Sequence, residues 1–202
     1  FQYLTLSDNH IFSPTLLNTI RTSFSRTNTF VKSPTDLVGP QYSFVPGEPI
    51  GALNVAGTDG LGPNGLSPND KLQNIYTPSD DLFYTRGSHS LKFGTLINRY
   101  QQYSLTSTQV RGQMVFANVQ AFLNAGPLVS YTAVTPGSTI DRSWEFTTLG
   151  FYAQDDYRVN SNLTLNLGLR YEFHSTFNET RGKGSSLRDI VRDSQFTVGP
   201  LF

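Results

Sequence analysis

Three glycines match the spacing of a phosphate-binding motif. Gly60, Gly62 and Gly65 have the G-x-G-x-x-G pattern of dinucleotide sites, which needs a strand before the motif and a helix after it. Pro63 and Pro68 prevent that helix. We therefore interpret the segment as a glycine-rich surface loop and expect no cofactor there.

Two pairs of adjacent carboxylates, Asp80–Asp81 and Asp155–Asp156, have the residue types of an acid–base pair. Neighbouring residues of a strand point to opposite faces of the sheet. Neither pair can therefore share a proton or a substrate, and we expect no catalytic residue among them.

The three histidines, His10, His89 and His174, have no neighbours at the spacings of metal ligands. His10 and His89 lie near predicted short turns, whereas His174 lies at the opposite end of its strand. We expect no metal site, and the G-x-S-x-G pattern of serine hydrolases does not occur in the sequence.

The composition favours strands and an uncharged surface. Of 202 residues, 15% are charged and 13% aromatic, there is no cysteine, and the formal net charge is zero. Lys and Glu, which favour helices, are scarce, whereas Ser, Thr, Asn, Tyr and Phe are abundant. A nucleic-acid partner, a disulfide framework and a cysteine-ligated metal are not indicated.

The clearest element is a strand over residues 164–173. Leu165, Leu167 and Leu169 alternate with Asn166, Gly168 and Arg170. A period of two over about ten residues matches the ~9–11 residues of a strand that crosses a bilayer. The preceding residues 147–158 predict an antiparallel partner, joined through Asn160–Asn162, although Tyr152 and Asp155 interrupt its alternation.

Two further hairpins complete an all-β prediction of about six strands. One has a turn at Gly87–Ser88, and the other has a turn around Asp8–His10, with Pro14 at the start of its second strand. The predicted strands cover residues 1–7, 14–27, 74–86, 90–103, 143–158 and 163–174.

Long and short connections alternate along the chain. Residues 28–72, 104–141 and 175–202 are predicted long loops, whereas the other connections have only a few residues. The first loop is predicted to be coil because of its prolines, and the second contains a short helix near Asn118–Asn124 that ends before Gly126–Pro127. Outer-membrane barrels have this alternation, with short periplasmic turns and long extracellular loops.

Three segments resemble one protein family. Residues 149–172 (LGFYAQDDYRV and LTLNLGLRYE) resemble a barrel hairpin of TonB-dependent outer-membrane receptors, and residues 88–94 (SHSLKFG) and 11–18 (IFSPTLLN) resemble other barrel strands of that family. All three segments resemble the large Oar-like receptors, which carry a carboxypeptidase-regulatory-like N-terminal domain.

This resemblance implies one section, residues 1–202, of a 22-stranded antiparallel transmembrane barrel in the outer membrane of a Gram-negative type bacterium. The plug domain and the segment that contacts TonB lie outside these residues. The chain starts without Met or a signal-type stretch, and we expect it to be a fragment. The implied partners are the lipid bilayer with lipopolysaccharide, the TonB system through the absent N-terminal region, and an unidentified extracellular substrate.

The alternation predicts which side chains face which solvent. Those predicted to face the lumen are Lys92, Gln154, Arg158, Asn166, Arg170 and Glu172. Those predicted to face lipid are Leu91, Phe93, Phe151, Leu165, Leu167 and Leu169. No catalytic, cofactor-binding or metal-binding residue is predicted, and the sequence does not identify the residues that bind substrate.

Two other functions fit the same sequence. A surface adhesin or assembly barrel would use the same loops to bind partners without transport. A soluble glycan-binding β-sandwich would bury its Leu and Phe side chains against a second sheet.

Overall fold

The computed structural model describes residues 1–31, 33, 39–106, 109–135, 137–187, 189–195 and 197–198. The chain divides into two compact units. Unit 1 comprises Phe1–Thr27, Gln73–Gln102 and Ser143–Phe202, and unit 2 comprises Asn28–Leu72 and Tyr103–Arg142.

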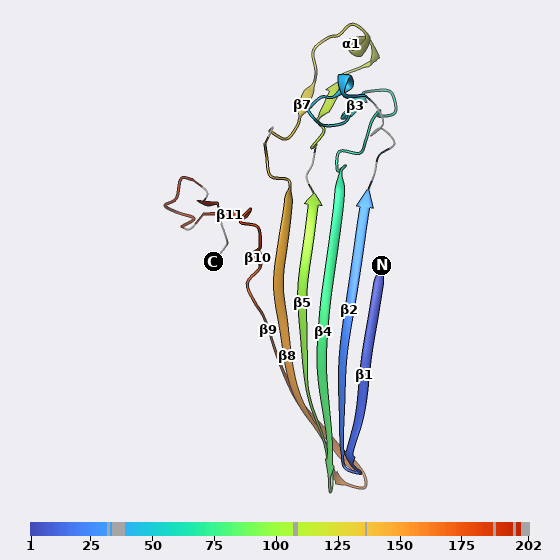
Figure 1. Ribbon diagram of the computed structural model, residues 1–202, viewed down its shortest axis with the longest axis vertical. Coiled ribbons are helices and arrows are strands. Elements are labelled where there is room, and N and C mark those ends of the chain that lie inside the picture. Colours follow the sequence, from blue (N-terminus) through green and yellow to red (C-terminus); the bar gives the residue numbers. More distant parts are fainter. Residues whose placement is uncertain are drawn as a thin grey trace. The chain divides into compact units, whose positions relative to one another are not determined.

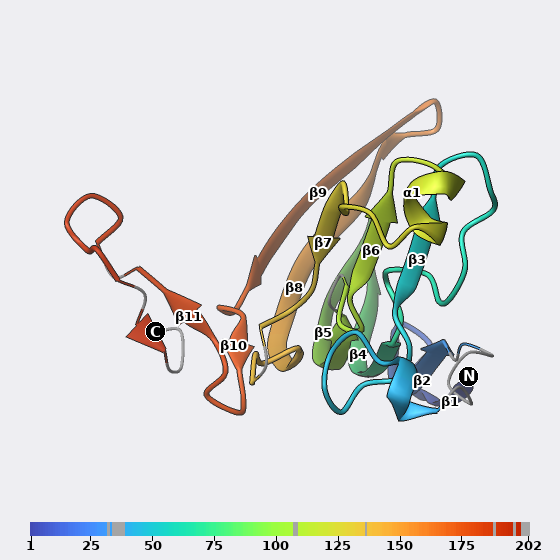
Figure 2. The ribbon, with the colours of Figure 1, turned by 90° about the horizontal axis from the view of Figure 1, so that it is seen from above.

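A long antiparallel sheet dominates unit 1. Its six long strands are β1 (Gln2–Ser13), β2 (Leu16–Val31), β4 (Asn69–Arg86), β5 (His89–Thr106), β8 (Asp141–Asn160) and β9 (Leu163–His174). They lie side by side in the order β1-β2-β4-β5-β8-β9 (Figures 1 and 2). The all-β antiparallel fold class is therefore confirmed, and the strands of 12 to 20 residues are far longer than the usual ~5–6.

Three short turns join these strands at the same end of the sheet. Gly87–Ser88 joins β4 to β5 and Ser161–Asn162 joins β8 to β9, as the sequence predicts. The turn expected around Asp8–His10 is wrong, because β1 continues to Ser13 and the chain reverses at Pro14–Thr15. Proline lacks the N–H that a strand interior requires, so Pro14 belongs in the turn rather than at the strand start.

The sheet of unit 1 has no apolar layer packed on it among the described residues. The described buried hydrophobic side chains are Val45, Ala52, Val55 and Val110, and all four belong to unit 2. On β9, by contrast, Leu167 is 59% exposed and Leu169 is 77% exposed. This exposure contradicts the β-sandwich alternative, which requires these residues to be buried.

Unit 2 contains a small second sheet. Its strands are β3 (Ala52–Val55), β6 (Gln113–Phe116) and β7 (Ser130–Thr132), with β3 parallel to β6 and β7 antiparallel to β6. The prediction that residues 28–72 are coil is therefore wrong at β3. Sequence periodicity does not reveal this strand, because β6, the strand that pairs with it among the described residues, lies in the other long connection.

A short helix, α1 (Val119–Leu123), follows β6 and confirms the predicted helix. The side chain of Asn118 accepts a hydrogen bond from the N–H of Ala121 at 2.7 Å, which caps the helix. Among the described residues of the first connection, Pro40–Tyr42 form a 3-10 helix, η2.

The segment after β9 continues along the outer edge of β8. β10 (Asn178–Glu179) pairs with Glu145 and Trp144 of β8, and β11 (Ser185–Ser186) pairs with β12 (Thr197–Val198). Glu179 is 1% exposed, and its carboxylate accepts hydrogen bonds from the N–H groups of Ser143 (2.9 Å), Arg181 (3.1 Å) and Lys183 (2.5 Å). These bonds fix the turn after β10 against β8.

Candidate functional site

One face of the long sheet carries polar side chains that bond across the strands. Thr5 bonds Ser23 at 3.0 Å, and Thr19 donates to Asn9 at 2.7 Å. Farther along the sheet, Asn98 accepts from Thr77 at 2.8 Å. These neutral pairs form a hydrogen-bonded surface, here called the polar face.

A tyrosine occupies the middle of the polar face. The hydroxyl of Tyr152 donates to the Asp81 carboxylate, and the ammonium of Lys92 lies 5.3 Å from the Tyr152 ring centre and 5.0 Å from that of Phe83. Gly94 makes room for this ring, because a Cβ there would lie 2.3 Å from the Tyr152 ring. The lysine charge is thus balanced by Asp81 within one cluster.

A hollow of about 250 Å³ opens next to this cluster. It lies over Gly150, which has no side chain to fill the space, and its lining includes Asn98, Thr148 and His174. Asn98 donates to the hydroxyl of Thr148 at 3.1 Å. Arg170 and Glu172, which also line the hollow, form an ion pair with each other.

An aromatic cluster lies on the same face, beyond the hollow and farther from the short turns. The rings of Tyr100 and Phe146 stack with centres 4.4 Å apart and an interplanar angle of 8°. Phe177 contacts Phe146 with ring centres 4.3 Å apart and is half exposed. Tyr100 lies two residues after Asn98, and Phe146 two residues before Thr148.

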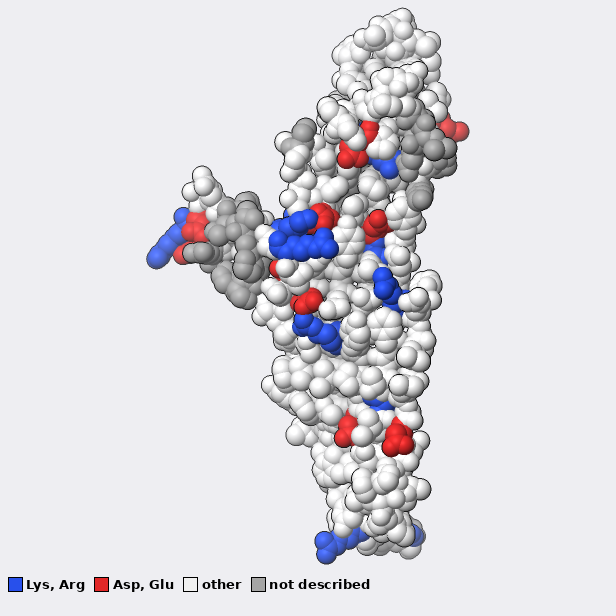
Figure 3. Space-filling view, in the orientation of Figure 1, with Lys and Arg blue, Asp and Glu red and all other residues white. Residues whose placement is uncertain are grey.

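The opposite face, here called the apolar face, is uncovered. The exposed apolar side chains on β5, β8 and β9 include Phe93, Phe151, Leu165, Leu167 and Leu169. Figure 3 shows small groups of charged residues over the strands, separated by wide uncharged areas. A polar pair interrupts this face near the short turns, where His89 Nδ1 lies 2.7 Å from Asp155 Oδ2 and its ring stacks on Tyr157 at 4.3 Å.

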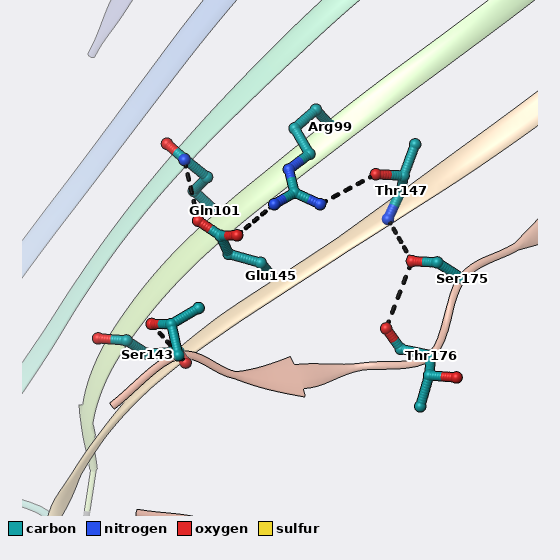
Figure 4. A network of polar contacts seen from close by, with 8 residues as sticks. Arg99, Gln101, Ser143, Glu145, Thr147, Ser175 and Thr176 are labelled. Atoms are coloured by element: carbon teal, nitrogen blue, oxygen red, sulfur yellow. Dashed lines mark hydrogen bonds and ion pairs between the residues drawn. The ribbon is translucent and has the colours of Figure 1, made fainter. Parts of the chain in front are cut away.

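A second polar cluster bounds the apolar face at the other end (Figure 4). Arg99 of β5 pairs with Glu145 of β8 and donates to the hydroxyl of Thr147 at 3.1 Å. Gln101 donates to Glu145 at 3.0 Å, and the Ser175 hydroxyl accepts from the N–H of Thr147 at 2.9 Å. Each side chain in this cluster thus has a partner on another segment.

The two polar clusters are ten residues apart on both strands. His89 and Arg99 lie on β5, and their stacking or hydrogen-bonding partners Tyr157 and Thr147 lie on β8. Ten residues of strand span roughly 33 Å. The apolar face is therefore a band of defined height.

The hairpins are also staggered against one another. The N–H of Thr85, two residues before the turn at Gly87, donates to the carbonyl of Thr15 in the first turn at 2.9 Å. The N–H of Arg158, three residues before the turn at Ser161, donates to Ser88 in the second turn at 2.8 Å. Each hairpin is thus displaced by two to three residues relative to the next.

The register separates the twelve residues selected from the sequence into two groups. Lys92, Gln154, Arg158, Asn166, Arg170 and Glu172 lie on the polar face, and Leu91, Phe93, Phe151, Leu165, Leu167 and Leu169 lie on the apolar face. Gly150, Tyr100 and Asp81 were not predictable from the sequence as parts of a site, because their positions relative to other side chains depend on the register between hairpins. The two residues that interrupt the alternation of β8 both have polar cross-strand partners: Tyr152 donates to Asp81, and Asp155 bonds His89.

The other candidate groups are dispersed. Asp80 accepts from Asn18 at 2.5 Å while Asp81 bonds Tyr152, and Asp155 bonds His89 while Asp156 accepts from Gln154 at 3.1 Å. Each aspartate pair is therefore split between two faces, as predicted. The glycine motif lies in a loop without a following helix, and Leu61 within it bridges to Leu53.

Within the described ranges, no group of three or more His, Asp or Glu residues is arranged to hold a metal ion. The same residues include no helix that is long and apolar enough to cross a bilayer.

The family comparison covers nearly the whole chain. The family model described as "Outer membrane beta barrel domain" matches residues 1–199. Neither a curated protein nor a solved structure matches the chain.

Proposed function

Because the chain belongs to the outer membrane β-barrel domain family and is therefore a protein of the outer membrane, we propose that it supplies part of the wall of a TonB-dependent receptor. The resemblance of residues 149–172, 88–94 and 11–18 to the Oar-like receptors supports this finer assignment. In the proposed receptor these six strands are part of a 22-stranded barrel, and other segments provide the plug and the contact with TonB.

In this proposal the apolar face contacts lipid and the polar face lines the lumen. The observation that carries the assignment is the bare apolar band between the His89 and Arg99 clusters. A length of ~33 Å along strands tilted by ~40° corresponds to a height of about 25 Å, which is the height of the apolar band in outer-membrane barrels.

The stagger of the hairpins supports the same geometry. A displacement of two to three residues is roughly 7–10 Å along the strand direction. Corresponding strands of neighbouring hairpins are two strands apart, which is roughly 9.6 Å across the sheet. If the three short turns lie at one level of the membrane, the strands tilt by roughly 35–45°. Membrane barrels have this tilt.

The two ends of the band then contact different surroundings. The short turns at Pro14–Thr15, Gly87–Ser88 and Ser161–Asn162 lie in the periplasm. The Arg99 cluster lies at the outer boundary, where a guanidinium and several hydroxyl and amide groups suit the sugars and phosphates of lipopolysaccharide. The long connections lie outside the cell and capture the substrate.

The facing assignment can be tested by single-cysteine labelling, since the chain contains no cysteine. In the complete receptor in membranes, Asn166→Cys should react with a water-soluble maleimide. Leu167→Cys should react poorly with that reagent and, when carrying a fluorophore, should be quenched by brominated lipids. The reverse pattern would overturn the assignment.

The transport role requires energy from the inner membrane. Uptake of the cargo by cells that produce the complete receptor should stop when the tonB gene is deleted, although cargo binding to the cell surface should persist. Uptake that continues at the same rate without TonB would refute the transport proposal.

A second candidate, an adhesin or assembly barrel, is favoured by one feature of unit 2. Around α1, Leu123 is 73% exposed and Val129 is 64% exposed, and residues 113–140 contain no charged side chain. Such a surface suits contact with another protein. Cell–cell or cell–surface attachment that is lost on Leu123→Asp, with unchanged uptake, would favour this candidate.

A further inference from the structure

The hollow over Gly150 and the aromatic cluster beside it form one continuous site on the polar face. On both β5 and β8, every second side chain lies on the polar face. The Tyr100–Phe146 stack is therefore next to the Asn98–Thr148 pair, and this pair lines the hollow. A flat apolar surface thus adjoins a hollow whose lining combines the hydrogen-bonding groups of Asn98 and Thr148 with the apolar residues Leu96 and Phe173.

The hydrogen-bonding groups of the pocket retain further capacity. Asn98 uses one amide N–H toward Thr148 and accepts at its amide oxygen from Thr77, so its second N–H and an oxygen lone pair remain. The hydroxyl of Thr148 accepts from Asn98 and can still donate. Groups that can donate and accept at neighbouring positions match hydroxyl groups, which do both.

The charges around the pocket are balanced inside the protein. Arg170 pairs with Glu172, and the charge of Lys92 is opposed by Asp81 through Tyr152. His174 also lines the hollow, and its Nδ1 lies 3.3 Å from the carbonyl oxygen of Ser175. A site for an anion would present unpaired cations, so this pocket favours a neutral ligand.

The size of the hollow limits what enters it. Its volume of about 250 Å³ lies just below the ~300–1,000 Å³ of pockets that enclose drug-sized molecules. One ring of a neutral sugar fits this volume, and a neighbouring ring can lie against the exposed face of Phe177.

From this arrangement we propose that the Gly150 hollow and the Tyr100–Phe146–Phe177 cluster form a subsite for one or two rings of a neutral oligosaccharide. The apolar C–H face of a sugar packs on the aromatic rings, and its hydroxyl groups bond Asn98 and Thr148. This inference rests on the proposed function, since it requires the polar face to line the lumen, and it names the cargo class of that transporter.

The experiment measures binding to the purified complete receptor in detergent by isothermal titration calorimetry. The neutral probes are maltohexaose, cellohexaose, xylohexaose and mannohexaose, and the anionic probes are a polygalacturonate hexamer and ferric enterobactin. Gly150→Val fills the hollow, where the atoms nearest to the new Cβ belong to the side chains of Arg170 and Glu172 at 3.3–3.5 Å. Tyr100→Leu removes the stacking surface but keeps an apolar side chain.

Two matched controls separate the subsite from general damage. Gly168→Val adds the same side chain to the polar face outside the lining of the hollow, where its Cβ has ordinary contacts at 3.7 Å or more. Phe151→Leu removes an aromatic ring from the apolar face. The migration of unheated receptor in SDS gels reports whether each variant forms a barrel.

At least one neutral probe should bind, and both Gly150→Val and Tyr100→Leu should weaken it at least tenfold, whereas the controls should change it less than twofold. The proposal is overturned if no neutral probe binds, if an anionic probe binds more tightly, or if Gly150→Val and Gly168→Val have equal effects. Because binding in detergent needs no TonB, uptake that survives tonB deletion would refute transport without touching this subsite.

Discussion

Arginine substitutions along β9 measure directly which face meets lipid and at what depth. Leu165 pairs with Tyr157 and therefore lies level with the His89 cluster, and Ser175 bonds Thr147 at the level of the Arg99 cluster. The middle of the band on β9 is thus next to Leu169, which is 77% exposed on the apolar face. Four residues separate Leu165 from Leu169, or roughly 10 Å of depth at a tilt of ~40°.

An arginine at the bilayer midplane costs a membrane barrel about 2–4 kcal/mol, and near an interface it costs about 0–1 kcal/mol. We therefore expect Leu169→Arg to lower the free energy of unfolding by about 2–4 kcal/mol and Leu165→Arg by about 1 kcal/mol or less. Leu167→Arg should fall between them. Equilibrium unfolding of the complete receptor from lipid vesicles in guanidinium chloride measures all three.

The matched control is Asn166→Arg, which adds the same charge to the polar face between two of these positions. It should change the free energy of unfolding by less than about 1 kcal/mol because its side chain meets water in the lumen. Equal costs at Leu165 and Leu169 would refute the depth assignment. A cost at Asn166 equal to that at Leu169 would refute the facing assignment.

Three further substitutions test local features. Gly94→Ala should destabilise the barrel by about 1–3 kcal/mol, because the new Cβ would lie 2.3 Å from the Tyr152 ring. Gly168→Ala, whose Cβ would have ordinary contacts at 3.7 Å or more, should change the free energy of unfolding by no more than about 0.5 kcal/mol in the same assay. Glu179→Ala should speed amide hydrogen exchange at Ser143, Arg181 and Lys183, since their acceptor is lost. Unchanged exchange at these residues would contradict the described turn. The control is Glu172→Ala, which removes an exposed carboxylate. Asn118→Ala should destabilise α1 by about 1 kcal/mol, and Asn118→Ser should retain its stability. Amide hydrogen exchange at Ala121 measures the difference. Equal exchange rates in the two variants would exclude the Asn118 cap.

The period-two pattern predicted the long sheet and its two faces because the direction of each side chain in a strand depends only on its position along that strand. From Leu165 to Phe173 every second residue is apolar. Successive side chains of a strand point to opposite faces, so this pattern alone places the apolar residues on one face. Turns with strong local signals, Gly87–Ser88 and Ser161–Asn162, were predicted for the same reason. Pro14 was misplaced because polar residues at Asp8–His10 also occur within strands that have a solvated surface.

The candidate site was not predictable in the same way. The Gly150 hollow exists because Asn98 from one hairpin meets Thr148 from the next, and nothing in either segment specifies that register. β3 has a similar explanation, since Ala52 pairs with Gln113 across a long stretch of chain. Short strands whose partners are distant carry little periodicity of their own.

The parallel pairing of β3 with β6 has a practical consequence for exchanging specificity between related proteins. Each of these strands comes from a different long connection, so the backbone hydrogen bonds between β3 and β6 depend on both connections and are lost when either is replaced alone. A chimera that receives only residues 28–72 from a related protein would lose the pairing of β3 with β6. A chimera that receives residues 28–72 and 103–142 together would keep it.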